Sequence, residues 1–386
     1  MSMRLSRSIV GEAEAEAVRR VIVDDGYLGM GETTRRFEGE IALYLGVEPW
    51  QITSVNSGTA ALHLAVQAVR TDAARSGVLD KMDGPPRILV PSLTFVSTFQ
   101  AITAGGCQPV ACDVLTETGT LDLEDAAKRL SPNVVAVMHV DYASNPWKID
   151  KVYEFARERG LRVIDDAAHA FGCRSRGRKI GSFGDLVCFS FDGIKNITCG
   201  EGGCVVSFRE EDSRLIGDAR LLGVEGDTAK RFAGERSWDP DVKNQGWRYH
   251  LSNIMAAVGS VQLKRLEKEF IPARRRLWEV YKRNLDQDRG IRLLRTDPED
   301  YIVPHIMPVR ILDGWRKKVA DALDKAAIPY GTHYKPNHLL TYFGGGEISL
   351  PNTEKLYGEL ITLPLHPGLT DEDVEFVCET IKNVLN

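Results

Sequence analysis

The chain has 386 residues, 43% of them hydrophobic, and its 49 basic and 54 acidic residues give a formal net charge of −5. This length can bury a large core and predicts two domains, while the interspersed charges argue against a nucleic-acid-binding face. The apolar region from Ile88 to Val114 is too often interrupted to predict a membrane span. The seven cysteines form no CxxC pair, so we expect reduced, buried thiols in a cytoplasmic protein, and no metal site.

The N-terminal 26 residues lack the apolar segment of a signal peptide and predict an amphipathic helix. From there to about residue 210, short apolar runs alternate with amphipathic stretches, which is typical of a mostly parallel sheet covered by helices. The predicted strands are ITSVNSG, PRILVPS, PVACDV, VVAVMHV, LRVIDDA, LVCFSF and GGCVVSF. The clearest helical periodicity lies at 59–70 and 147–160. No GxGxxG follows the first strand, so a nicotinamide or flavin site is not indicated.

Residues 211–244 are polar and irregular, which predicts a loop or flap. A long helix is expected over 251–284, with an interruption near Ile271–Pro272. A strand at 301–311 and helices at 315–327 and 370–386 then predict a smaller α+β domain. We therefore expect a large domain over residues 1–245 and a small domain, with its linking helix, over 246–386.

Two segments carry residues with chemical potential. FSFDGIKNITCGEGG, from Phe189 to Gly203, places Lys195 between a strand-like run and a glycine-rich turn, and IDDAAHAFG contains Asp165, Asp166 and His169. A lysine that forms a Schiff base and a carboxylate that keeps a pyridine nitrogen protonated are the minimum for pyridoxal phosphate chemistry. Each residue alone has a plainer interpretation, as a surface lysine or as a helix-capping or metal-binding acid. Because side chains alternate along a strand, the two aspartates should point to opposite faces.

A third segment, NSGTAALHLAV, is a turn of small residues that opens a helix. Backbone N–H groups and the helix dipole converge at such a point, which favours binding of a phosphate. The alternative is an ordinary helix cap made by Ser57 or Thr59.

These segments resemble the signature segments of the DegT/StrS family of nucleotide-sugar aminotransferases, and the resemblance extends over nearly the whole chain. It implies an α/β, fold-type I, aspartate aminotransferase-like fold with a large, mostly parallel sheet domain and a smaller C-terminal α+β domain. It implies that Lys195 binds pyridoxal 5′-phosphate and shuttles a proton between cofactor and substrate. Asp166 would pair with the pyridine nitrogen, and His169 would lie near the ring oxygen, although a structural role for this histidine is the alternative.

The resemblance also implies phosphate contacts from Gly58, Thr59 and Ser190, and stacking on the pyridine ring by Phe95, for which a core role is the alternative. A further phosphate contact would come from the neighbouring subunit's QGWRYHLSN segment, so a homodimer with shared sites is expected. Arg248 stands there where relatives often have asparagine or lysine, and arginine can bind phosphate bidentately.

Substrate contacts are implied in two further segments. GYLGMGETTRRFEGEIALYLG resembles a family segment in which Gly29, Met30 and Gly31 would border the sugar pocket. GTHYKPNHLL resembles another, in which His333 and His338 would contact the sugar or its diphosphate. A structural hydrogen-bonding role for either histidine is the alternative.

The implied reaction converts a nucleotide-linked 4-keto-6-deoxyhexose to its 4-amino sugar. L-Glutamate, or alternatively glutamine, supplies the amino group, and pyridoxamine 5′-phosphate is the intermediate form. The product would serve a cell-surface polysaccharide, such as the O-antigen of lipopolysaccharide, or a related glycoside. KNITCGEGG, which begins at Lys195, resembles relatives that act at sugar position 4. Amination of a 3-keto sugar, dehydration by an enzyme of the same fold, and a non-catalytic regulator are the alternatives, the last disfavoured by the retained Lys195 and Asp166.

Overall fold

The computed structural model describes residues 3–235, 239, 241–286 and 289–385. Residues 1–2 of the predicted N-terminal helix, residues 236–238 and 240 of the predicted flap, and residue 386 of the last predicted helix lie outside these ranges.

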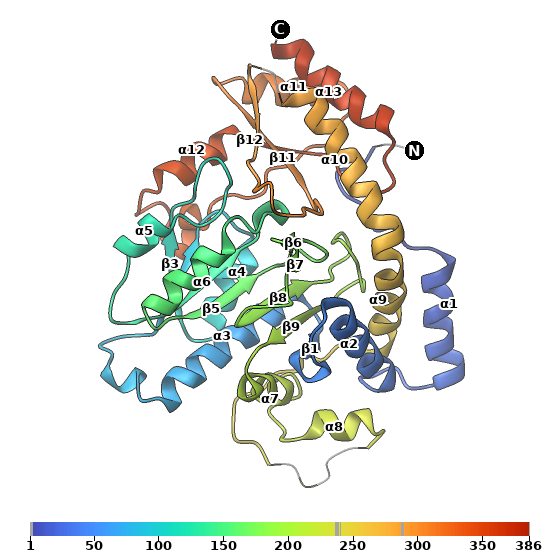
Figure 1. Cartoon of the computed structure of the whole chain (residues 1–386), viewed down its shortest axis with the longest axis vertical. Helices are drawn as coiled ribbons and strands as arrows, with labels where there is room; N and C mark the ends of the chain where they lie inside the picture. The colour runs from blue at the N-terminus through green and yellow to red at the C-terminus, as the bar shows by residue number, and fades with distance from the viewer. Residues whose placement is uncertain (1–2, 236–238, 240, 287–288, 386) are drawn as a thin grey trace.

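A seven-stranded sheet forms the centre of the molecule (Figure 1). Its order is β1 (Ile52–Val55), β9 (Gly203–Ser207), β8 (Leu186–Ser190), β5 (Arg162–Asp166), β4 (Val134–Val140), β2 (Arg87–Pro91) and β3 (Gln108–Cys112). Strand β9 is antiparallel to both of its neighbours, and the other pairs are parallel. All seven predicted runs are strands, because short apolar, β-branched segments suit a sheet buried on both faces. The predicted α/β fold class is confirmed.

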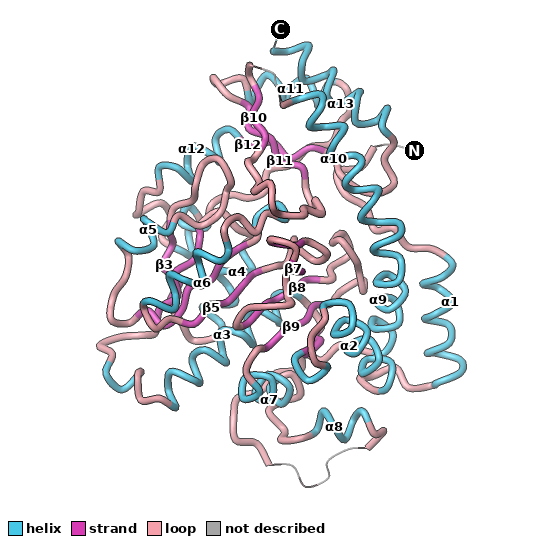
Figure 2. The backbone as a smooth tube through the Cα atoms, in the orientation of Figure 1, coloured by secondary structure: helices cyan, strands magenta, loops and turns pink. Residues whose placement is uncertain are grey.

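Helices cover both faces of this sheet, as the helices around the strands in Figure 2 show. Helices α3, α4 and α7 pack on the face that carries Val90, Ile164 and Val205. Helices α2, α5, α6 and α9 pack on the opposite face. The bounds of these helices are α2 Glu32–Leu45, α3 Gly58–Arg75, α4 Val96–Ala104, α5 Leu123–Lys128, α6 Ile149–Glu158, α7 Glu210–Ala219 and α9 Asn253–Arg265. The predicted helices at 59–70 and 147–160 correspond to α3 and α6.

The prediction of a loop over 211–244 was wrong in part, because two helices lie in this segment. They are α7 and the short α8 (Asp227–Phe232). Helix α7 buries Leu215, Ile216 and Ala219 in the core beside α3. Those apolar positions lie on one side of the helix behind an acidic first turn, so a segment of low overall hydrophobicity still folds against the sheet.

The long helix expected over 251–284 is present, with its interruption. Helix α9 continues through a π-helical turn at Leu266–Phe270 into α10 (Ile271–Leu285). Proline at the start of α10 is tolerated because the first turn needs no donor there. The predicted N-terminal helix begins only at Glu12, as α1 (Glu12–Arg20), and packs against α9 (Figure 1).

A second sheet lies towards the C-terminal end of the chain, in the order β10 (Ile291–Leu293), β11 (Met307–Ile311) and β12 (Leu360–Leu363). Helices α10, α11 (Arg316–Lys325) and α13 (Asp371–Leu385) form a separate core with it. Of the strand predicted at 301–311, only Met307–Ile311 is a strand. The remaining elements are α12 (Pro351–Glu359), β6 (Arg174–Ser175) and β7 (Arg178–Lys179). The domain division after residue 245 stays a prediction.

Two expectations from composition can be compared with this structure. All seven cysteines are buried and none forms a disulfide, as predicted. Among the described residues, no helix combines the length and apolar character needed to cross a bilayer.

Candidate active site

One cavity of about 330 Å³ lies where the carboxyl ends of β5 and β8 meet the first turn of α3. Ligand sites in open α/β sheets are expected at this edge of the strands. Seven of the residues singled out from the sequence line it: Gly58, Thr59, Phe95, Asp166, His169, Ser190 and Lys195. His333 joins them from the C-terminal part of the chain. The structure therefore brings most of the predicted site together.

Lys195 follows β8 in a turn closed by its backbone N–H, which donates to the carbonyl of Asp192 at 3.1 Å. Its Nζ lies 3.3 Å from Nε2 of His305. Desolvation lowers the lysine pKa to about 8, against the opposing charges of Asp192 and Asp166. The amine is therefore available as a base or nucleophile much nearer neutral pH than an exposed lysine.

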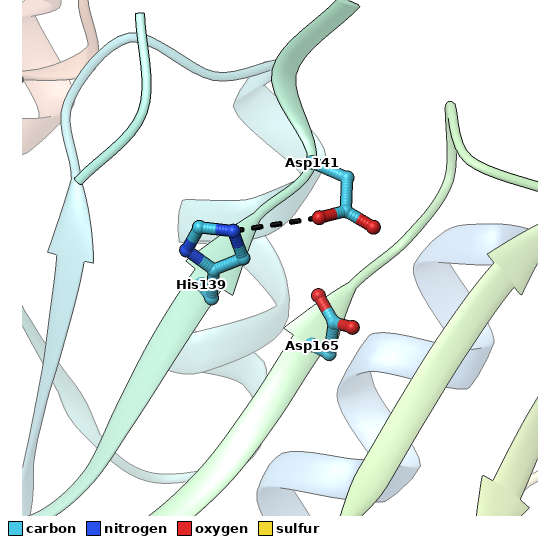
Figure 3. A group of neighbouring side chains, drawn as sticks. All are labelled: His139, Asp141 and Asp165. Carbon is cyan, nitrogen blue, oxygen red and sulfur yellow. Dashed lines mark ion pairs between the residues drawn. The ribbon is translucent and has the colours of Figure 1, made fainter. Parts of the chain in front are cut away.

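Asp166 ends β5 and faces the cavity. Its carboxylate accepts hydrogen bonds from the Thr98 hydroxyl at 2.8 Å and from the Ala168 N–H at 3.3 Å. Burial raises the pKa of this carboxyl, while these two bonds and the Lys195 charge act in the opposite direction. Asp165 does not line the cavity and instead lies beside His139 and Asp141 (Figure 3). The predicted alternation of the two aspartates is confirmed.

His169 forms part of the cavity wall with residues from the C-terminal part of the chain. Its Nε2 lies 3.1 Å from the Tyr334 hydroxyl, and its ring centroid lies 4.6 Å from that of His305. Burial holds the pKa of both histidines well below the usual value, so both are neutral at pH 7. A neutral imidazole can exchange a hydrogen bond with a ring oxygen without adding charge.

The first turn of α3 supplies the donors expected for a phosphate. Ser57 caps the helix by accepting a hydrogen bond from the Ala60 N–H at 3.1 Å. Gly58 and Thr59 line the cavity, and N–H groups at a helix start have no acceptor within the helix. A Cβ at Gly58 would come within 2.7 Å of the Ser190 Cβ. Glycine thus lets the helix start and the Ser190 hydroxyl approach the same point.

Two further predicted residues lie at the mouth of the cavity. The Phe95 side chain is 53% exposed and its ring lies 5.4 Å from that of Tyr334. It is therefore a wall residue rather than a core residue. His333 places Nδ1 3.0 Å from the Thr362 hydroxyl, and desolvation lowers its pKa to about 4.

The remaining predicted residues do not line this cavity. His338 is fully buried, with Nδ1 2.7 Å from the Ser92 hydroxyl, which fits the structural alternative. The Arg248 side chain is exposed. Gly29 and Gly31 instead exchange hydrogen bonds with a buried asparagine at the start of α9, and Met30 is buried beside them.

The titratable lining or neighbouring residues that the sequence reasoning missed include Asp192, Glu201, His305 and Tyr334. Tyr334 lies inside the segment that drew attention to His333 and His338. His305 lies in the predicted strand at 301–311, and a histidine within an apolar run was the available signal. Nothing in the sequence around His305 or Tyr334 indicates that they contact Lys195 and His169, which lie more than a hundred residues earlier.

Comparison with known proteins identifies the family of this chain. The model of the DegT/DnrJ/EryC1/StrS aminotransferase family matches residues 8–382. The chain belongs to this family. It is 34% identical to a dTDP-4-dehydro-2,3,6-trideoxy-D-glucose 4-aminotransferase from Saccharopolyspora spinosa, covering 99% of this chain and 97% of that protein. The crystal structure of the aminotransferase TlmJ from Streptoalloteichus hindustanus matches with a TM-score of 0.89 at 30% identity, covering 100% of this chain and 99% of that one.

A third relative extends the range of sugars. The present chain is 28% identical to a UDP-4-amino-4,6-dideoxy-N-acetyl-β-L-altrosamine transaminase from Campylobacter jejuni, with 98% of this chain and 96% of that protein covered. Together these findings make the protein a pyridoxal-phosphate-dependent sugar aminotransferase of nucleotide-sugar or deoxysugar biosynthesis.

The cavity of the aminotransferase fits this cofactor. Any larger residue at Gly58 would place a Cβ against Ser190, so glycine leaves room for a phosphate at the helix N-terminus. Lys195, with its lowered pKa, and the carboxylate of Asp166 face the same space. The donor set thus offers one partner for each of the phosphate, the aldehyde and the ring nitrogen.

Proposed function

We propose that the protein aminates a nucleotide-linked 4-keto-6-deoxyhexose, with L-glutamate as the amino donor. The product is the 4-amino sugar, for a cell-surface polysaccharide such as O-antigen or for a related glycoside, made in the cytoplasm. The observation that carries the proposal is that Lys195 and Asp166 face one cavity beside a phosphate-binding helix start. Position 4 is supported by the name of the Saccharopolyspora spinosa relative and by the KNITCGEGG segment.

The roles of the cavity residues follow from their chemistry. Bound pyridoxal phosphate supplies an electron sink that makes the proton on the neighbouring carbon acidic. Lys195 holds the cofactor and then, as a free amine, moves that proton. Asp166 keeps the ring nitrogen protonated through an ion pair, and its Thr98 bond fixes the carboxylate.

The other lining residues would hold the phosphate and the ring. The first-turn N–H groups of Gly58 and Thr59 and the Ser190 hydroxyl bind the phosphate. Phe95 would cover one face of the ring, and His169 would donate to its oxygen. These contacts orient the cofactor and exclude water from the reacting carbon.

The sugar enters at the mouth of the cavity, beside His333, Tyr334 and Glu201. Hydroxyl and imidazole groups there can hydrogen-bond the sugar hydroxyls without adding positive charge. His338 we assign to a structural role. Gly29, Met30 and Gly31 do not line this cavity, and their contact with the sugar stays a proposal.

Among the described lining residues, Lys195 alone carries a cationic side chain of lysine or arginine. A phosphate and a nucleotide diphosphate both favour further cationic partners. We therefore propose a homodimer in which Arg248 of one subunit reaches the cavity of the other. In that dimer the exposed arginine would neutralise the negative charge of the cofactor phosphate or of the nucleotide diphosphate.

Mixing inactive Lys195→Ala and Arg248→Glu chains tests the shared site. A hybrid dimer then contains one site with both changes and one with neither, so about half the wild-type activity per hybrid should return. Hybrid dimers that form and stay inactive would contradict the exchange of Arg248. Each parent alone must be inactive for the experiment to be interpretable.

The reaction itself is tested with 4-keto and 3-keto sugars linked to dTDP, UDP or GDP. Purified protein, pyridoxal phosphate and glutamate are incubated with each, and product mass and amine position are determined. Amination at position 4 supports the proposal. Amination at position 3, or loss of a hydroxyl without gain of nitrogen, would replace it with one of the two enzyme alternatives.

A further inference from the structure

Three side chains meet on the face of β4 and β5 opposite to Asp166: His139, Asp141 and Asp165 (Figure 3). His139 and Asp165 are register partners in adjacent strands, and Asp141 follows β4 directly. Each is at most 1% exposed. One imidazole nitrogen and two carboxylate oxygens lie within 4.8 Å of one another.

These groups lack the hydrogen bonds that buried polar atoms normally make. Both ring nitrogens of His139, both carboxylate oxygens of Asp141 and Oδ1 of Asp165 have no hydrogen-bond partner among the described residues. Leaving buried polar atoms unpaired is costly, and three carboxylate oxygens and two ring nitrogens without a partner at one point favour a ligand. The orphan atoms are of the types that coordinate metal ions.

The surroundings of the cluster are acidic. Asp166 follows Asp165 directly in β5, and its backbone carbonyl accepts the Asp141 N–H. Bound as carboxylates, Asp141 and Asp165 would balance the charge of one divalent ion.

We propose that His139, Asp141 and Asp165 bind one structural divalent transition-metal ion of the Zn²⁺ or Mn²⁺ class. Imidazole with carboxylates suits these ions, whose bonds to such ligands are about 2.0–2.2 Å. Tetrahedral ligands at that radius lie about 3.4 Å apart. Nε2 of His139 and Oδ1 of Asp141 are already 3.4 Å apart, without a hydrogen bond between them. The Asp165 oxygen lies within 4.8 Å of the other two ligand atoms and would have to move closer to complete the set.

The ion would tie β4 to β5 beneath the catalytic carboxylate. The N–H of Asp141 donates to the carbonyl of Asp166 at 3.1 Å, so the turn after β4 is already fixed to the end of β5. Sequence analysis predicts no metal here. His139 and Asp141 are close in the chain and Asp165 lies in the next strand of the sheet, and this spacing matches no recognisable metal-binding motif. Full burial implies that the ion enters during folding and exchanges slowly.

The test measures metal content of the purified holoenzyme, which does not depend on the reaction catalysed. Protein is unfolded with chelator, refolded with Zn²⁺, Mn²⁺ or Co²⁺ alone, dialysed and analysed by inductively coupled plasma mass spectrometry. The expected result is about one ion per chain, with the visible spectrum of four-coordinate cobalt in the Co²⁺ sample. Asp141→Asn should lose the ion and lower the melting temperature.

Asp300→Asn is the matched control, because it removes a nearby acidic charge without removing a ligand, and it should keep the ion. Less than about a tenth of an ion per wild-type chain with every metal would overturn the proposal and assign the cluster to protons or water. So would retention of a full ion by Asp141→Asn. If that variant does not fold, the wild-type stoichiometry and His139→Gln decide the question.

Discussion

The lowered pKa of Lys195 predicts how its amine reacts in the cofactor-free protein. With a pKa of about 8, about 9% of the amine is deprotonated at pH 7, against about 0.03% for a lysine at its usual 10.5. The free amine is thus about 300-fold more abundant. Labelling with trace acetic anhydride across pH 6–11, followed by peptide mass spectrometry, reports the midpoint. Lys317 is the internal reference, since its bond to Asp321 raises its pKa.

A substitution sharpens this prediction. Desolvation is the dominant cause of the shift, and Asp192 is the first charge that opposes it. Asp192→Asn removes that charge at constant size, so the Lys195 midpoint should move below 8 and towards neutral pH. A midpoint for Lys195 above 10 in the wild type would refute the desolvation argument. A rise on Asp192→Asn would show that the aspartate does not act through its charge.

Three other changes test separate parts of the site and fold. His305→Ala removes the hydrogen-bond partner of the reactive lysine, and loss of about 1 kcal/mol should lower kcat about fivefold in steady-state assays. Gly58→Ala brings a Cβ within 2.7 Å of the Ser190 Cβ, so the cofactor Kd should rise at least about tenfold in an absorbance titration. Arg220→Met leaves the buried Glu38 without its cationic partner and should reduce the free energy of urea unfolding by about 3–5 kcal/mol.

Matched controls separate these effects from general damage. Gly39→Ala adds a Cβ that meets nothing within 4 Å, so it should leave cofactor affinity unchanged. Arg214→Met removes an exposed ion pair with Glu210 and should cost less than about 1 kcal/mol. Equal losses in control and test variants would contradict the close approach at Gly58 or the burial argument at Arg220.

Local signals explain why much of the fold and part of the site were predictable. Apart from the edge strand β3, the strands of the large sheet are short apolar runs that are almost fully buried, so composition alone marks them. The period-two alternation of a strand then separates Asp166, in the cavity, from Asp165 on the opposite face. Lys195 was recognisable because a strand and a glycine-rich turn enclose it.

Other features depend on contacts that sequence does not display. His305 and Tyr334 contact Lys195 and His169 only because the fold brings the C-terminal part of the chain to the cavity. His338 lies in the same segment as His333, but its turn carries it into a buried bond with Ser92. The path of the backbone through this segment therefore decides that His333, and not His338, lines the cavity.

The reactivity of the Lys195 amine therefore depends on how the C-terminal part of the chain packs against the turn after β8. Lys195 belongs to the turn after β8, yet its hydrogen-bond partner, His305, lies two residues before β11. The buried Arg274 of α10 donates to the carbonyls of both Lys195 and His305. A shift of β11 or α10 would change the distance between amine and imidazole together with the desolvation that lowers the lysine pKa. Substrate contacts at His333 and Tyr334 come from the same C-terminal part of the chain, so sugar binding and lysine reactivity share one structural support.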